Sequence, residues 1–205
     1  LRFDPGVAKV RELVSGSAIG KLISVNAYVG QYLPDWRPAE DYRLGMSALN
    51  STGGGVMLDL IHEVDYLNFF CGETQKVACN YINSGTLEIE TEDSADILIK
   101  YKNGVTGMVH LDYLQRILRR YCIFTGSAGT INLDLVAKEV LWSGGEGALK
   151  KFSYCEHSRN DRFVDITKAF ILGDERVCTF NDGVHSLKQV FAAKKSSEEN
   201  LVITL

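Results

Sequence analysis

The sequence predicts an α+β fold: a single domain with one large, mostly antiparallel sheet and helices on one of its faces. Three observations lead to this prediction. Between residues 76 and 142, short runs alternate apolar and polar side chains with the period of two expected of strands. Apolar residues at helical spacing occur near both chain ends and after the glycines at 53–55. Strands that follow one another directly, instead of alternating with helices, favour an antiparallel sheet over a parallel one.

The first part of the chain is expected to form a helix, a strand and a long loop. Asp4 and Pro5 are typical of the N-cap and the first position of a helix, and Gly16 is suited to end it. Residues 31–51 contain two prolines and no regular period, so we expect an irregular loop, which in a compact domain is commonly functional. The strand between them, at 23–29, is expected to bury Ile23, Val25, Ala27 and Val29 on one face.

The second part of the chain is expected to hold the rest of the sheet and two more helices. Asn103-Gly104, between two alternating runs, is a strong signal for a β-hairpin. The acidic residues at 87–93 are interpreted as a solvated lead-in to that hairpin. The remaining expected elements are strands at 76–82, 95–101, 105–111, 119–124, 130–135 and 139–142, a turn at 145–148, helices at 161–172 and after Asp182-Gly183, and an edge strand at 201–205.

The stretch from Gly53 to Gly72 carries the candidate chemistry. Its residues predict one buried helix, apolar on most sides and ended by a glycine. Asp59, His62 and Asp65 recur at i, i+3 and i+6, which puts them on one slanted stripe of such a helix with neighbours in contact reach. A carboxylate beside an imidazole fixes the ring tautomer and raises its pKa, so this stripe predicts a general acid/base site.

Two other interpretations of the same stripe stay open. A histidine on a buried helix can be a hydrogen-bonded structural residue without a catalytic role. Asp59, His62 and Asp65 are also possible metal ligands, but a helical zinc site usually presents two histidines at i and i+4, and only one is present here. We therefore expect no metal. Glu63 and Tyr66, which border the stripe, are interpreted as rim residues.

The loop ahead of the glycines mixes aromatic rings with charged side chains. Rings can cover the apolar faces of a sugar, and arginine and carboxylate groups can bind hydroxyls or phosphates, so the loop predicts a site for a polyhydroxylated ligand. The alternative is that the rings only anchor the loop. The candidate binding residues are Tyr32, Trp36, Arg37, Asp41 and Arg43.

Composition excludes several classes of protein. The net charge is −4 and Lys and Arg do not cluster beyond adjacent pairs, so nucleic acid is not an expected partner. No apolar run is long enough to span a bilayer, and the N-terminus lacks a signal-peptide pattern, so no membrane partner is expected. The five cysteines are odd in number and scattered, which indicates reduced thiols in a cytoplasmic protein.

The chain also lacks the Gly-x-Gly-x-x-Gly turn with which a dinucleotide-binding domain holds a pyrophosphate. Its nearest lookalike, Gly145-Glu146-Gly147-Ala148, is not followed by a helical pattern and is expected to be a turn. The sequence opens on Leu1 without an initiator methionine. Together these observations predict a fragment that lacks its cofactor-binding half.

The glycines followed by Asp59, His62 and Asp65 resemble the substrate-domain helix of the Gfo/Idh/MocA oxidoreductases, the glucose–fructose oxidoreductase and inositol dehydrogenase group. The resemblance covers the chain from Asp4 to Leu205. It implies that His62 and Asp65 flank the sugar carbon that exchanges hydride with NAD or NADP, and that the binding residues include Gly54 and Gly55. One departure is that the family spacing is Asp-x-x-x-His, whereas Asp59 precedes His62 by three residues.

This resemblance implies that residues 1–205 form the substrate-binding and oligomerisation domain of an NAD(P)-dependent sugar oxidoreductase. The dinucleotide-binding domain would be absent from this chain, so the fragment alone is expected to be inactive. The competing hypothesis is a non-catalytic ligand-binding or assembly module of the same fold. A homodimer or homotetramer is expected to form through the sheet face that carries Leu98, Met108 and Leu114 among Asp96, His110 and Asp112.

Overall fold

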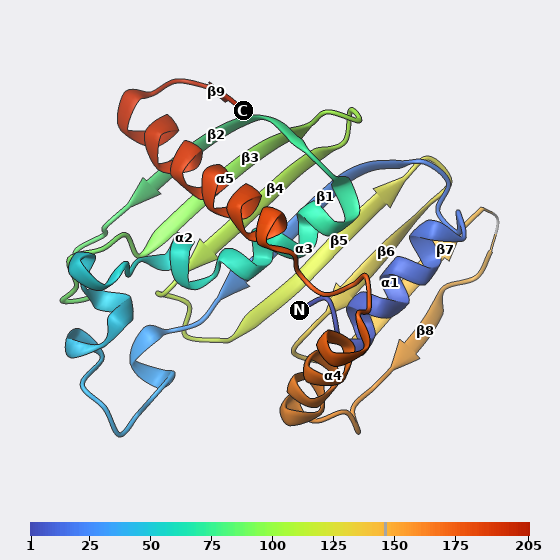
Figure 1. The fold of residues 1–205 in the computed structure, drawn as a ribbon, viewed down its shortest axis with the longest axis horizontal. Helices are drawn as coiled ribbons and strands as arrows, with labels where there is room; N and C mark the ends of the chain where they lie inside the picture. The colour runs from blue at the N-terminus through green and yellow to red at the C-terminus, as the bar shows by residue number, and fades with distance from the viewer. Residues whose placement is uncertain (146) are drawn as a thin grey trace.

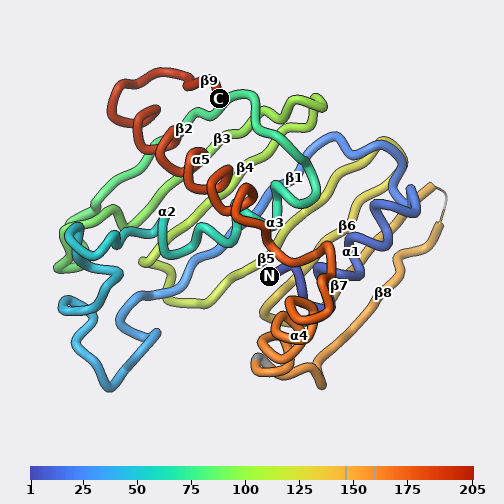
Figure 2. Tube along the Cα trace, viewed as in Figure 1, coloured from blue at the N-terminus to red at the C-terminus, as the bar shows by residue number. Residues whose placement is uncertain are grey.

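A nine-stranded sheet with the order β8-β7-β6-β5-β1-β4-β3-β2-β9 lies at the centre of the computed structural model, which describes residues 1–145 and 147–205, except for the side chain of Arg159 (Figures 1 and 2). The strands are β1 (Leu22–Gly30), β2 (Thr74–Ile82), β3 (Ser94–Tyr101), β4 (Thr106–Asp112), β5 (Arg119–Gly126), β6 (Gly129–Asp134), β7 (Glu139–Gly144), β8 (Lys150–Ser153) and β9 (Ile203–Thr204). Only β1 and β4 pair in parallel among the described strands, and the sheet is therefore mostly antiparallel.

The helices gather on one face of this sheet, as Figure 1 shows for α1, α3 and α5. The α-helices of the described residues are α1 (Pro5–Ser15), α2 (Val56–Asp59), α3 (Ile61–Cys71), α4 (Arg159–Leu172) and α5 (Phe180–Glu199). Their apolar sides and the facing strand residues form one core, to which Val10, Val64, Val109, Phe124 and Val190 contribute fully buried side chains. The predicted α+β fold with helices on one face is confirmed.

The opposite face of the sheet carries no helix among the described residues. Register aligns Asn26 of β1 with Ile123 of β5 on one side and with Met108 of β4 on the other, and Met108 in turn faces Leu98 of β3. These side chains point away from the core, and Leu98 and Met108 are exposed. The hairpin predicted at Asn103-Gly104 is confirmed, with Gly104 at a positive φ of 92° in the turn.

One residue of the predicted buried face of β1 lies outside the core. Val25, Ala27 and Val29 are buried, but Ile23 is 50% exposed. The pairing of β1 with β5 shifts register between Leu22 and Ser24, so the side-chain alternation is interrupted at Ile23. The prediction that Ile23 joins the buried face was wrong, because the residue types of the strand do not indicate the β-bulge.

The helix predicted from the glycines to Cys71 is broken into two. α2 ends at Asp59, and Leu60 has φ −100° and ψ 19°, outside the helical range, before α3 starts at Ile61. Glu92 fixes the direction of α2, because its carbonyl accepts from the backbone N–H of Val56 and its carboxylate from that of Met57. The core fixes the direction of α3. The chain leaves helical geometry at Leu60 because α2 and α3 are held in different directions.

The acidic segment before β3 is buried at its end, contrary to the prediction of a solvated face. Glu92 is buried and pairs with Lys194 of α5 at 3.1 Å. Asp93 is fully buried and accepts hydrogen bonds from the backbone N–H and the hydroxyl of Ser84. Carboxylates are rarely buried unless they are paired or hydrogen-bonded, and both conditions are met here.

Chain ends and turns differ from the predictions in smaller ways. α5 begins at Phe180, ahead of the Asp182-Gly183 pair after which the helix was predicted, because Thr179 and Asp182 form a capping box. Strand β8 was not predicted. The turn predicted at 145–148 falls partly on Glu146, which lies outside the described residues. The five cysteines, all of them described, are free.

No helix in the described part of the chain combines the length and the apolar character needed to cross a membrane.

Candidate functional site

A pocket of about 770 Å³ opens where the end of β1, the loop after it, the start of α3 and the side of α4 meet. Trp36 and Arg37 of the loop, His62 of α3, Arg120 of β5 and Arg162 of α4 bring polar or aromatic groups to its wall. The remaining lining is mainly apolar and consists of Leu1, Val29, Gln31, Leu60, Leu118, Leu135, Val136, Phe163 and Ile166. A concavity that combines apolar walls with convergent polar groups is typical of a small-molecule site.

His62 is the candidate acid/base residue that reaches this pocket. Its side chain is 38% exposed, and its Nε2 atom lies 3.3 Å from Oε1 of Glu63. Because Glu63 holds one ring nitrogen, the other nitrogen is left to exchange a proton with a bound molecule. The stripe predicted on a continuous helix does not form: neither Asp59 nor Asp65 contacts the ring, and Glu63 contacts it instead.

Glu63 is fully buried, and the interpretation of it as a rim residue was wrong. Arg120 donates two hydrogen bonds to its Oε1 atom, from Nε at 2.9 Å and from Nη2. Burial opposes the ionisation of Glu63, but Arg120 and His62 more than offset it, so the pKa of this carboxyl lies below its ordinary value. Glu63 therefore stays a carboxylate beside His62.

Tyr66 is also fully buried and not a rim residue. Burial above all, and then the interactions with the buried thiol of Cys122 and the carboxylate of Glu63, raise the pKa of its phenol far above the ordinary value. Its hydroxyl has no hydrogen-bond partner among residues 1–145 and 147–205. Tyr66 belongs to the core behind the pocket.

Asp59 lies outside the lining of the pocket and anchors the loop. Its Oδ2 atom accepts from the hydroxyl of Tyr113 at 2.8 Å and from the hydroxyl of Ser47. Burial, followed by the negative charge of Asp59, raises the pKa of Tyr113 well above its ordinary value, so Tyr113 remains a donor. Asp59 thus ties the residues after β4 to the loop before the glycines.

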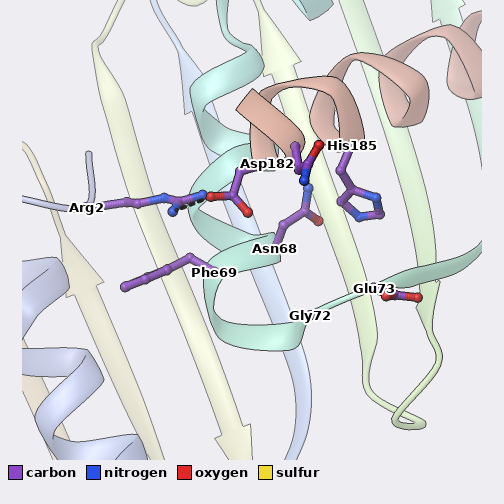
Figure 3. Close-up of a pocket in the computed structure, with 8 residues that line it drawn as sticks. Arg2, Asn68, Phe69, Gly72, Glu73, Asp182 and His185 are labelled. Atoms are coloured by element: carbon purple, nitrogen blue, oxygen red, sulfur yellow. Dashed lines mark hydrogen bonds and ion pairs between the residues drawn. The ribbon is translucent and has the colours of Figure 1, made fainter. Parts of the chain in front are cut away.

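Asp65 points to the other side of α3. Its two oxygens accept from Nε and Nη2 of Arg2 at 3.2 and 2.8 Å. Arg2 also donates to Asp182 at 3.1 Å, and this second contact lies in a separate pocket of about 470 Å³ (Figure 3). Asp65 is therefore a counter-ion of Arg2 and is not in the pocket that contains His62.

Two of the five predicted loop residues reach the pocket. The indole of Trp36 donates to the carbonyl of Gln31 at 3.2 Å and meets the ring of Tyr113 edge-on at 5.4 Å between centroids. Arg37 is exposed at the pocket mouth, with Glu40 4.0 Å away. Tyr32 stacks under Arg116, whose guanidinium carbon lies 3.5 Å from the ring centroid.

Asp41 and Arg43 lie on the outer surface of the loop. Arg43 donates from Nε and Nη2 to both oxygens of Asp41 and from Nη1 to Glu88. These hydrogen bonds lower the pKa of the Asp41 carboxyl. The pair is not in the lining of the pocket with His62, so the structure does not bring these two residues to that site.

Gly54 and Gly55 make room for the chain itself. A Cβ on Gly54 would lie 2.4 Å from the carbonyl oxygen of Met46, and Gly55, with φ +108°, would meet the carboxylate of Glu92. The N-terminus of α2 is already occupied by that carboxylate. A dinucleotide pyrophosphate therefore does not fit this glycine run, because its position is taken and its charge would be repelled.

Glu63, Arg120 and Arg162 belong to the site and were not predicted from the sequence. Glu63 gave a usable signal, since a charge in an apolar helix needs a partner. Arg120 and Arg162 gave none, because they lie on β5 and α4, far from α3 in the sequence.

A family model described as the GFO/IDH/MocA C-terminal domain matches residues 7–132, which is more than half of the chain. A search of curated proteins found no match.

Several solved oxidoreductases share the fold. Levoglucosan dehydrogenase in complex with NADH and levoglucosan gives a TM-score of 0.87 at 16% sequence identity, over 100% of this chain and 64% of that one. An oxidoreductase from Agrobacterium radiobacter, with NAD+, L-tartaric acid and magnesium, gives 0.82 at 19%, over 100% and 63%. Aldose-aldose oxidoreductase from Caulobacter crescentus, with glycerol, gives 0.80 at 18%, over 100% and 62%. The chain thus spans less than two thirds of the length of these three proteins.

Proposed function

Because the chain belongs to the GFO/IDH/MocA C-terminal domain family, we propose that it is the substrate-binding part of an NAD(P)-dependent oxidoreductase acting on a sugar or sugar derivative. The observation that carries this proposal is the 770 Å³ pocket with His62 in its wall and an aromatic–arginine pair, Trp36 and Arg37, at its mouth. The neighbours solved with levoglucosan and with glycerol support a polyol-like ligand. Residues 1–205 would form one domain.

In this proposal His62 is the acid/base group. Oxidation of a sugar carbinol removes a hydride from carbon and a proton from the hydroxyl, and the imidazole takes that proton as the carbonyl forms. In reduction the same ring returns the proton to the carbonyl oxygen. Glu63 holds the ring at Nε2 and, as a buried carboxylate, stabilises the imidazolium that forms.

NAD or NADP, held by a dinucleotide-binding domain outside this sequence, would supply the hydride acceptor. The glycine run before α2 does not fit the pyrophosphate, since Glu92 occupies the N-terminus of α2 and a Cβ on Gly54 or Gly55 would meet neighbouring atoms. The chain alone is therefore proposed to be inactive. Its contribution is to bind and orient the sugar and to move the proton. The five free thiols favour a cytoplasmic location.

The test uses the protein joined to its dinucleotide-binding domain. NADH formation is followed by absorbance with a panel of polyols and sugars, first for the unaltered protein and then for His62→Asn. We expect turnover with at least one polyol, and a loss of kcat in the variant with unchanged NADH affinity. Failure of every polyol to support turnover would favour the second candidate function, a non-catalytic sugar-binding or assembly module.

We further propose that two copies associate through the open sheet face as a homodimer, or as pairs within a homotetramer. Leu98 and Met108 are exposed in the centre of that face, among polar side chains, which suits a self-complementary contact. Met108→Asp should dissociate the assembly in light scattering. Leu187→Asp on α5 is the matched control, since Leu187 is 41% exposed and Met108 43%. A monodisperse monomer before any substitution would contradict this proposal.

A further inference from the structure

The pocket with His62 presents arginines to its interior but no carboxylates among the described residues that line it. Arg37, Arg120 and Arg162 all line it. Arginines are seldom left facing a cavity without an acidic partner in the same wall, because each guanidinium offers five donors that need acceptors. The acidic partners of Arg120 and Arg162 exist, but they lie behind the guanidinium groups.

Arg120 illustrates this arrangement. Its partner Glu63 is fully buried, whereas the Arg120 side chain is 23% exposed. Both hydrogen bonds to Glu63 come from Nε and Nη2, and both end on the same oxygen. The Nη1 group has no acceptor among residues 1–145 and 147–205. The buried carboxylate thus fixes the orientation of the guanidinium and leaves one edge of it unpaired.

Arg162 is arranged in the same way from the opposite side. Its Nη1 atom reaches Oδ2 of Asp4 at 3.4 Å, and Asp4 is itself a buried N-cap that accepts from Gly6. Asp4 lines a smaller pocket of about 160 Å³ behind the site, which Arg120 and Arg162 separate from the main pocket. The Nε and Nη2 groups of Arg162 are without an acceptor in the described part of the chain.

These contacts leave the wall of the pocket with a net positive charge. Each arginine is paired, but the positive group is nearer to the pocket than its carboxylate, and in a partly desolvated site the nearer charge dominates. Two guanidinium groups with unpaired edges form a recognition element for a planar or tetrahedral anion.

We infer that the substrate is an anionic sugar derivative, whose carboxylate or phosphate binds between Arg120 and Arg162 while a carbinol lies at His62. This inference rests on the proposed function and narrows its substrate class. Neutral polyols would enter the same pocket but would leave the unpaired guanidinium edges to water. The anion would therefore set both affinity and the direction in which the carbon chain lies.

The experiment compares three ligands with the same six-carbon chain: D-glucitol, D-gluconate and D-glucitol 6-phosphate. Binding to the full protein is measured by isothermal titration calorimetry at low ionic strength. We expect at least one anion to bind tenfold or more tightly than glucitol, since charge-assisted hydrogen bonds are lost with the neutral ligand. The two anions distinguish a carboxylate source from a phosphate source. The preference should shrink as salt is added.

Substitutions test which residues cause the preference for an anion over glucitol. Arg162→Gln should reduce the affinity for the anion about tenfold and change the affinity for glucitol far less. Arg11→Gln, which removes the same charge at a residue of α1 that does not line the pocket, is the matched control and should keep the preference. Removing Arg120 alone would leave the buried Glu63 without its partner. The contribution of Arg120 is therefore tested with the double variant Glu63→Gln/Arg120→Gln. If Arg162→Gln does not fold, Arg162→Lys should retain a weakened preference.

The outcomes separate this inference from the proposed function. Equal affinity for all three ligands, no binding of any of them, or an anion preference that survives Arg162→Gln, would overturn the assignment of an anionic substrate. None of these results depends on hydride transfer, so the oxidoreductase proposal would still stand or fall on the turnover of His62→Asn. Conversely, an anion preference lost with Arg162 supports the inference even when turnover does not require His62.

Discussion

The two pockets beside α3 both contain an arginine and a histidine, but they differ in where the carboxylates lie. In the 470 Å³ pocket, Arg2 meets Asp182 within the pocket wall, and Glu73 faces the same space as His185 (Figure 3). In the 770 Å³ pocket, the described lining includes no acidic side chain. The first pocket is therefore neutralised from within, and the second is left cationic.

The comparison shows that the position of a counter-ion decides what an arginine can do. Where the carboxylate shares the pocket, it takes the place that a ligand anion would occupy, and the pair serves stability. Where the carboxylate is buried behind the arginine, it orients the guanidinium and leaves donors for a ligand. The histidines of the two pockets also differ in the group that contacts the ring. His62 is held by a buried carboxylate, whereas the Nε2 atom of His185 lies 3.5 Å from the backbone nitrogen of Thr74.

The largest difference between the two pockets is expected in kcat, when the histidine of each pocket is replaced by asparagine. His62→Asn should lower kcat about 100-fold or more in the complete enzyme, because a positioned acid/base contributes ~10²–10⁴-fold. His185→Asn, the matched change in the other pocket, should leave kcat within about twofold. Steady-state NADH formation measures both. Similar losses in the two variants would mean that the pockets do not differ in function.

The next effect concerns stability at the two arginines. Arg120→Gln leaves the fully buried Glu63 without its partner, so the free energy of unfolding should fall by about 3 kcal/mol. Arg2→Gln should cost only about 1 kcal/mol, because its partners Asp65 and Asp182 remain partly exposed and water can solvate them. Urea denaturation monitored by circular dichroism gives both values.

A double variant serves as the control for that comparison. Glu63→Gln/Arg120→Gln removes both charges together, and it should recover a large part of the loss seen for Arg120→Gln. If the double variant is as unstable as the single one, the loss comes from packing around the guanidinium and not from the stranded carboxylate.

The smallest effect is expected at His110, whose counter-ions sit beside it on the open sheet face. Its ring nitrogens lie 2.7 Å from Asp96 and 3.0 Å from Asp112, and it stacks on Tyr28. The hydrogen bond to Asp112, partly opposed by burial and supported by Asp96, raises the pKa of His110 above 6.5. The stability from these pairs is complete below pH 6.5 and is lost as pH rises through the raised value.

The loss at His110 should be below about 1 kcal/mol, since Asp96 is exposed to solvent. Unfolding measured between pH 5.5 and 9 should show this decline, and His110→Gln should flatten it. An unchanged slope in that variant would assign the pH dependence to other groups.

Much of the fold was predictable because its signals are local. Asp4 does cap α1 with Pro5 in its first turn, and Asn103-Gly104 does turn between β3 and β4. The errors occur where a distant residue decides. Glu92 binds the N-terminus of α2 and fixes its direction, and the helix is interrupted at Leu60. The residue types of Glu92 and Leu60 do not indicate this effect.

The candidate site was less predictable for the same reason. Spacing on an ideal helix grouped Asp59, His62 and Asp65, but Ser47, Glu63 and Arg2 are their actual neighbours. Two of those partners come from other segments of the chain. Which arginines line the pocket depends on how β5 and α4 pack, and no spacing along the chain encodes it.

The central position of β1 has a consequence for the order of folding. β1 pairs with β4 and β5, whose residues follow it by roughly 80 to 100 positions, whereas β2–β4 and β5–β8 are chains of neighbouring antiparallel strands. Contacts between distant residues require loop closure and form slowly. We therefore expect the two meanders to form first, and the insertion of β1 between them to limit the rate at which the sheet is completed.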